Sequence, residues 1–130
     1  MAIMVDTSVW IDFFRGSETL EVERLVTYIK QNERIFTGDL ILAELFQGIR
    51  YDKELTAIEV AFRPFLVIDM VGETNARQSA TFYRELRTQG ITIRKTIDCL
   101  IAAWCIQNQI PLLHADGDFR PFVSLGLIEA

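Results

Sequence analysis

Short apolar segments alternate with helical segments along the whole chain, and this alternation constrains the fold more than any other feature. Strands are predicted at residues 3–5, 34–37, 65–68, 111–114 and 126–128. Apolar residues at helical spacing predict helices at 9–14, 18–31, 39–49 (weakened by Gly48), 52–62, 73–88 and 97–107, and residues 115–119 are expected to form a loop. This order predicts an α/β fold with three α/β/α layers, in which helices cover both faces of a central, mainly parallel sheet.

The length and composition of the chain favour a single globular domain. Half of the 130 residues are hydrophobic, so one domain over residues 1–130 is expected. No apolar run approaches the length of a membrane span, and no leader segment is recognisable, so a cytoplasmic protein without membrane contact is expected. Cys99 and Cys105 fall on one predicted helix, where they cannot reach each other, and are interpreted as core residues.

The distribution of charge is more informative than its sum. The chain has a net charge of −5, which taken alone disfavours a nucleic-acid partner. Residues 77–95, however, carry five cations against one anion. An acidic site beside a basic strip suits a phosphate-backbone substrate. The alternative is that the strip is an ordinary solvated helix face.

Four acids stand in apolar surroundings or directly after predicted strands. Asp6 and Asp116 each follow a strand, whereas Glu44 and Asp98 lie within apolar helical segments. The carboxyl ends of parallel strands meet at one edge of a sheet, where ligands bind. Ionised carboxylates are rarely buried without a partner, and Mg²⁺ or Mn²⁺ prefers carboxylate oxygen. Such a site activates water and holds a scissile phosphate, which predicts phosphodiester hydrolysis.

Each acid also has an ordinary interpretation when it is considered alone. Asp98 is suited to stabilise a helix N-terminus, and Asp6 to cap the helix that follows it. Glu44 is compatible with an exposed position on its helix. Asp116 and Asp118, in Asp-Gly-Asp, are typical turn residues. The functional hypothesis therefore depends on the four acids converging at one sheet edge.

Four sequence motifs resemble those of PIN-domain nucleases, in the same order and over essentially the whole chain. They are Val-Asp-Thr-Ser-Val-Trp at 5–10, Ala-Glu at 43–44 followed by Gly48, Asp-Cys-Leu-Ile-Ala-Ala at 98–103, and Leu-Leu-His-Ala-Asp-Gly-Asp-Phe at 112–119. Short members of this family are typically VapC-type toxins of toxin–antitoxin pairs. The resemblance implies an α/β/α fold and Mg²⁺- or Mn²⁺-dependent endoribonuclease activity on structured RNA such as tRNA or rRNA. It also implies a homodimer and an antitoxin partner.

The resemblance also assigns roles to individual residues. Position by position, Asp6, Glu44, Asp98 and Asp116 become the metal-binding acidic quartet. Ser8 matches a polar residue that orients the site by hydrogen bonding, and Asp118 matches a frequent additional acid. His114 is a departure, because the family often has Thr or Ser two residues before the fourth acid; a titrating group near the metals and a strand-end residue with a satisfied ring are both compatible with it.

Residues flanking the acids are candidates for contact with RNA. Arg15, Arg94 and Lys95 could contact phosphate, although surface positions without function explain them equally well. The aromatic residues Trp10, Phe13 and Phe14 are interpreted mainly as core or as a groove for a partner helix, with base stacking as the alternative. Two other functions stay open, namely a housekeeping nuclease for RNA processing and a non-catalytic PIN-like binding module that acts with an antitoxin in operon repression.

Overall fold

The structure is a computed structural model that describes residues 1–130, and its centre is a sheet of four parallel strands. The strands lie in the order β3-β2-β1-β4 and comprise β1 (Ala2–Val5), β2 (Arg34–Gly38), β3 (Leu66–Ile68) and β4 (Leu112–Leu113). Met4 of β1 pairs with Phe36 on one side and with Leu112 on the other. Ile3, Met4 and Val5 are fully buried, as expected for an inner strand covered on both faces.

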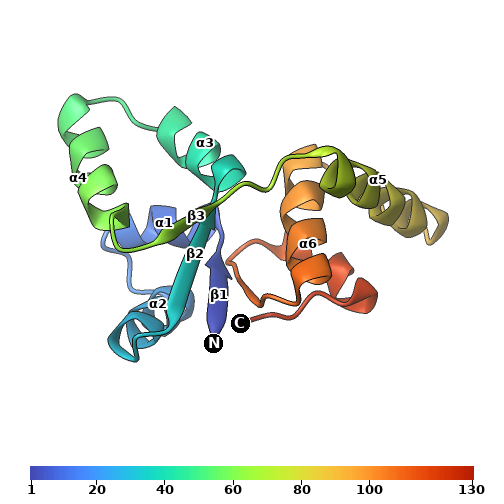
Figure 1. The fold of residues 1–130 in the computed structure, drawn as a ribbon, viewed down its shortest axis with the longest axis horizontal. Helices are drawn as coiled ribbons and strands as arrows, with labels where there is room; N and C mark the ends of the chain where they lie inside the picture. The colour runs from blue at the N-terminus through green and yellow to red at the C-terminus, as the bar shows by residue number, and fades with distance from the viewer.

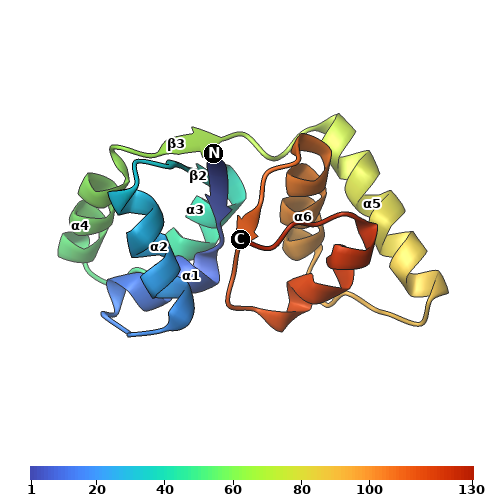
Figure 2. The ribbon, with the colours of Figure 1, turned by 90° about the horizontal axis from the view of Figure 1, so that it is seen from below.

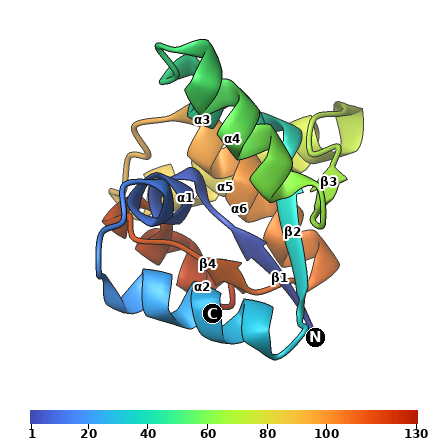
Figure 3. The same ribbon diagram turned by 90° about the vertical axis from the view of Figure 1, so that its left-hand side faces the viewer.

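Helices flank the sheet on both sides, so the predicted three-layer α/β/α arrangement is confirmed (Figures 1 and 2). One side carries α1 (Thr7–Phe14), α2 (Leu20–Lys30) and α4 (Asp52–Phe62), and Figure 3 looks onto that side. The short helix α3 (Asp39–Gln47) follows β2 and packs on α1. The other side carries α5 (Glu73–Thr88) and α6 (Thr96–Asn108).

Helix α6 is the most buried helix, because it lies between the sheet and α5 (Figure 1). Its buried residues include Ile101, Ala102, Ala103 and Cys105, which lie all round the helix rather than on one stripe. A helix covered by neighbours on several sides has this composition. The burial matters for function, because Asp98 lies in the first turn of the same helix.

Three local predictions were wrong, all near glycines. The third helix ends at Gln47 with Gly48 as its C-cap, so it does not extend to Ile49. The predicted loop at 115–119 becomes, from Gly117, a 3₁₀ helix η1 (Gly117–Leu125), whose first turn Asp116 caps by accepting from the Asp118 backbone N–H at 2.9 Å. The last predicted strand is not formed, because Gly126 has a φ of 110° that closes η1, and only Glu129 makes a bridge, to Leu112.

Several interior features agree with the apolar composition. No helix of the chain has the length and apolar character needed to cross a bilayer. Cys99 and Cys105 are free and buried, and burial raises the pKa of the Cys99 thiol to about 11, as expected of core residues. Gly38 ends β2 with its Cα against the side chain of Met70, so a β-carbon there would overlap the sulfur atom.

Candidate active site

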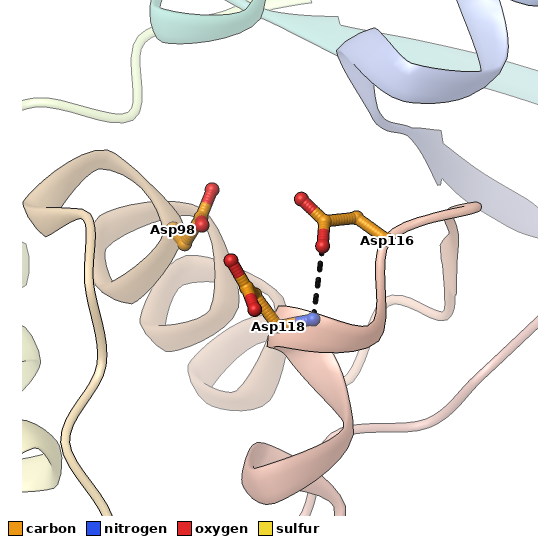
Figure 4. Close-up of side chains that lie close together, drawn as sticks. All are labelled: Asp98, Asp116 and Asp118. Atoms are coloured by element: carbon orange, nitrogen blue, oxygen red, sulfur yellow. Dashed lines mark hydrogen bonds between the residues drawn. The ribbon is translucent and has the colours of Figure 1, made fainter.

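Three carboxylates converge beside the carboxyl end of β4. Asp98 comes from the first turn of α6, Asp116 from the segment after β4, and Asp118 from the first turn of η1. One side-chain oxygen from each lies within 4.8 Å of the other two. Figure 4 shows the three carboxyl groups directed toward a common space, with the Asp118 backbone N–H bonded to the Asp116 carboxylate. The parallel topology produces this convergence, because it places strand ends and the start of α6 at one edge.

Asp98 is the most perturbed of the three carboxyl groups. The residue is 4% exposed, and its Oδ2 atom is buried without any hydrogen-bond partner. Burial and the neighbouring charges of Asp6 and Asp116 raise the pKa of Asp98 from 3.8 to about 7. A buried carboxylate oxygen without a partner is costly for a fold, and a bound cation would remove that cost.

Asp6, at the end of β1, is held by the residue that the first motif places two positions after it. The Ser8 hydroxyl donates to Asp6 Oδ2 at 2.6 Å, and the Ser8 backbone N–H donates to the same oxygen at 3.1 Å. The Ser8 hydroxyl also accepts from the backbone N–H of Ala115 at 3.0 Å. Asp6 therefore caps α1 and is tied, through Ser8, to the segment that carries Asp116. Burial raises its pKa.

Glu44 faces the site from α3 and is oriented by Thr7. The Thr7 hydroxyl donates to Glu44 Oε1 at 3.1 Å. Burial raises the pKa of Glu44, the negative charges of Asp6 and Asp116 act in the same direction, and Lys95 opposes them. Glu44 and Asp6 therefore lie close enough to Asp98 for their charges to affect its pKa, although neither belongs to the tightest group of carboxylates.

The three candidate RNA-contacting cations are dispersed around the acids. Arg94 binds both carboxylate oxygens of Asp118, at 3.0 and 3.1 Å, from a largely exposed position. Lys95 precedes α6, and its positive charge offsets part of the rise in the pKa of Asp98 and of Glu44. Arg15 lies apart from this group, at the end of α1, in a groove next to Glu44.

The aromatic residues of α1 form part of the core. Trp10 is fully buried and packs edge-on against Phe62 at 4.7 Å and stacked with Phe14 at 6.0 Å between ring centroids. Phe13 contacts both Trp10 and Phe14. Trp10 is therefore closed off from stacking on a base, whereas Phe14 also lines the groove near Glu44.

The sequence does not predict two residues that hold the site, and it understates the role of one acid. Asp118 was expected as an auxiliary acid, yet it belongs to the tightest group of carboxylates. Thr7, which binds Glu44, lies between Asp6 and Ser8 in the first motif, where the sequence alone does not indicate its partner. Glu129, which binds His114 from the other end of the chain, had no local signal.

The donor set fits a hard divalent cation. All the converging ligands are carboxylate oxygens, which Mg²⁺ and Mn²⁺ prefer over nitrogen or sulfur ligands. The mutual repulsion that raises the Asp98 pKa and the unpartnered Asp98 Oδ2 are both features that a cation would relieve. Once a cation neutralises the negative charge of these carboxylates, a phosphate can approach this edge of the sheet.

Comparison with known proteins gives a consistent result. Residues 3–122 match the family described as the PIN domain. The chain is 32% identical to Ribonuclease VapC11 of Mycobacterium tuberculosis, over 98% of this chain and 96% of the relative. Among solved structures, VapBC2 from Rickettsia felis, bound to a promoter DNA fragment, has a TM-score of 0.79 at 19% identity and covers 100% of this chain and 98% of its own. The Mycobacterium tuberculosis toxin VapC20, which cleaves the sarcin-ricin loop, has a TM-score of 0.69 at 18% identity, with 98% of both chains covered.

Proposed function

The chain belongs to the PIN-domain family, and from this we propose that it is a metal-dependent endoribonuclease and the toxin of a toxin–antitoxin pair. The observation that carries the proposal is the convergence of Asp98, Asp116 and Asp118 with a buried, unpartnered oxygen on Asp98. A binding module without catalysis has no need of such a costly arrangement. The curated relative is named a ribonuclease, which supports the same reaction class.

Asp98, Asp116 and Asp118 are proposed to hold Mg²⁺ or Mn²⁺, with Asp6 and Glu44 completing the acidic site. The ion would supply charge neutralisation, polarisation of a phosphate oxygen and a water of lowered pKa. The residues of the chain orient these ligands. Ser8 fixes Asp6 by two hydrogen bonds to one oxygen, and Thr7 fixes Glu44.

The substrate is proposed to be structured RNA, such as tRNA or rRNA. The solved toxin VapC20, which this fold resembles, cleaves the sarcin-ricin loop. Lys95 stands at the start of α6 beside the acids, where it can position an RNA phosphate. Arg94 is a second candidate, but its guanidinium must share Asp118 with any cation bound there.

A groove beside Glu44 is the proposed docking surface for the antitoxin. It has a volume of about 640 Å³ and an apolar lining that includes Ile11, Phe14, Leu45, Ile49 and Ile58. Arg15, Arg50 and Glu54 contribute polar groups to the same groove. An amphipathic segment fits a groove of this composition. The VapBC complex among the similar structures supports a protein partner. We also propose that the chain forms a single domain and assembles as a homodimer.

Cleavage of total cellular RNA by the purified, partner-free protein tests the activity. Discrete fragments are expected with Mg²⁺ or Mn²⁺, and none with EDTA. Asp98→Asn should abolish them, whereas Asp69→Asn, which neutralises an exposed aspartate without hydrogen-bond or ion-pair partners, should not. Cleavage that persists in Asp98→Asn or in EDTA would refute the proposed site.

Co-purification with the product of the adjoining reading frame tests the partner. Wild-type protein is expected to retain a small partner, and Ile49→Glu to lose it, because a charge would replace half-buried apolar surface in the groove. Asp69→Asn again serves as the surface control. Equal retention by Ile49→Glu and wild type would exclude this groove as the docking surface.

A further inference from the structure

His114, the only histidine of the chain, makes hydrogen bonds through both of its ring nitrogens. It follows β4 and precedes Asp116 by two residues, and its side chain is 6% exposed. Nε2 lies 2.8 Å from Glu129 Oε2, and Nδ1 lies 3.3 Å from the backbone nitrogen of Asp116. The ring also packs against Phe119, at 5.1 Å between ring centroids. Two hydrogen bonds and one aromatic contact therefore hold the ring in place.

The two partners select one tautomer of the neutral ring. The Asp116 backbone N–H is a donor, so Nδ1 must present a lone pair. The ring proton then lies on Nε2, where it is donated to the Glu129 carboxylate. In the opposite tautomer, the Nδ1–H group would face the Asp116 backbone N–H, and both groups are donors. The unprotonated Nε2 would face the Glu129 carboxylate, and both of these are acceptors.

Glu129 reaches this position because the C-terminal segment lies along β4. The Leu112 backbone N–H donates to the Ile128 carbonyl at 2.8 Å, and the Ala130 N–H donates to the Leu112 carbonyl at 2.9 Å. These bonds form the bridge between Leu112 and Glu129. The end of the chain is thereby connected, through one imidazole ring, to the backbone of a candidate site residue.

We propose that His114, held as the Nε2–H tautomer by Glu129, is a positioning residue that fixes the backbone of Asp116 and so directs its carboxylate into the acidic site. The inference rests on the proposed function of that site. Asp116 has a second constraint from its own side chain, which accepts from the Asp118 N–H. The backbone and the side chain of Asp116 are thus both held by hydrogen bonds. The carboxylate oxygen that does not bind Asp118 points toward Asp98 and Asp118, as Figure 4 shows.

Two amide substitutions of His114 distinguish a role in positioning the Asp116 backbone from a role in packing alone. The carbonyl of Asn at position 114 can accept from the backbone N–H two residues later, as in an Asx turn. Gln is one methylene longer, and its amide lies nearer the place of Nε2, where it can bind Glu129 but not the Asp116 N–H. His114→Asn should therefore keep the positioning bond, and His114→Gln should lose it.

The tautomer can be measured directly, because a protein labelled with ¹⁵N-histidine and freed of any tag contains one imidazole. At pH 8 and without metal, the nitrogen shifts and couplings are expected to identify Nε2 as protonated and Nδ1 as unprotonated. Glu129→Gln should preserve this pattern, because its amide oxygen still accepts, and Glu129→Ala should mix the two tautomers. A protonated Nδ1 in the wild-type protein would overturn the inference.

Binding of Mn²⁺ alone measures the positioning without reference to RNA. The dissociation constant for Mn²⁺ is expected to rise about 10-fold in His114→Gln and to stay within about 3-fold of wild type in His114→Asn. Under cleavage conditions His114→Gln should lower kcat and leave KM for RNA unchanged. Equal Mn²⁺ affinity in the two variants would overturn the inference. A wild-type protein that binds Mn²⁺ and shows the expected tautomer but cleaves no RNA would refute the nuclease and leave this inference standing.

Discussion

The crowding of carboxylates predicts that Asp98→Asn stabilises the metal-free protein while removing its proposed activity. The Asp98 pKa is about 7 in the folded protein, against 3.8 for an unperturbed aspartate. An acid with a raised pKa holds its proton more tightly in the folded state than in the unfolded state. Stability is therefore lost as the pH rises from about 4 to about 7, and the loss is complete above that range.

The size of the effect follows from the shift itself. At about 1.36 kcal/mol per pKa unit, the shift of Asp98 corresponds to a loss of at most about 4 kcal/mol at pH 8. Asparagine keeps the size of the side chain but cannot ionise, so the variant should recover much of this free energy. At pH 5 the folded wild-type protein already carries the proton on Asp98, and the advantage of the variant should fall to at most about 2 kcal/mol.

Urea unfolding followed by tryptophan fluorescence in EDTA, at pH 8 and pH 5, measures both free energies. Asp69→Asn, an exposed position, controls for the loss of one negative charge. Adding Mg²⁺ at about 100 times its dissociation constant should stabilise the wild-type protein by about 2.7 kcal/mol and leave Asp98→Asn unchanged. The reasoning is refuted if Asp98→Asn is less stable than wild type at pH 8 in EDTA, or if its advantage does not shrink toward pH 5.

Three further substitutions address other contacts around the acids. Thr7→Val removes the hydroxyl that holds Glu44 and should lower kcat about 10-fold in RNA cleavage assays, with the fold retained by circular dichroism. Arg94→Gln should leave the midpoint of urea unfolding nearly unchanged, because its ion pair with Asp118 is exposed to solvent on the arginine side. The same variant should raise KM for RNA if Arg94 contacts a phosphate. Gly38→Ala should destabilise the protein by about 1–3 kcal/mol in the same unfolding assay, because the added methyl group would overlap the methionine packed behind it; an unchanged midpoint would show that the methionine moves aside.

The parts of the fold that the sequence predicts well are those governed by local pattern. The apolar run of β1 and the all-round apolar character of α6 are visible without any structure, and both lie where an α/β/α fold needs them. The parallel topology then follows from alternation, and with it the sheet edge at which Asp6 and Asp116 lie. Boundaries near Gly48 and Gly126 were less predictable, because a glycine either ends an element or is tolerated within it, depending on tertiary packing.

The details of the site were less accessible, because they depend on pairs that are distant along the chain. Arg94 and Asp118 are 24 residues apart, and Thr7 and Glu44 are 37 apart. Asp-Gly-Asp has the composition of an ordinary turn, and only the 3₁₀ conformation of η1 brings Asp118 beside Asp98. Local sequence therefore identifies the acids, whereas tertiary packing decides which of them converge.

Glu44 connects the two surfaces on which the proposed function depends. Its Oε1 accepts from Thr7 at the acidic edge, and the same residue lines the apolar groove of α1, α3 and α4. The negative charges of Asp6 and Asp116 raise the pKa of Glu44, so its carboxylate interacts electrostatically with these acids. A partner that fills the groove must therefore contact, or desolvate, a carboxylate that belongs to the site. We therefore expect occupancy of the groove and binding of a cation to be coupled through this one side chain, and linkage would require the coupling to act equally in both directions.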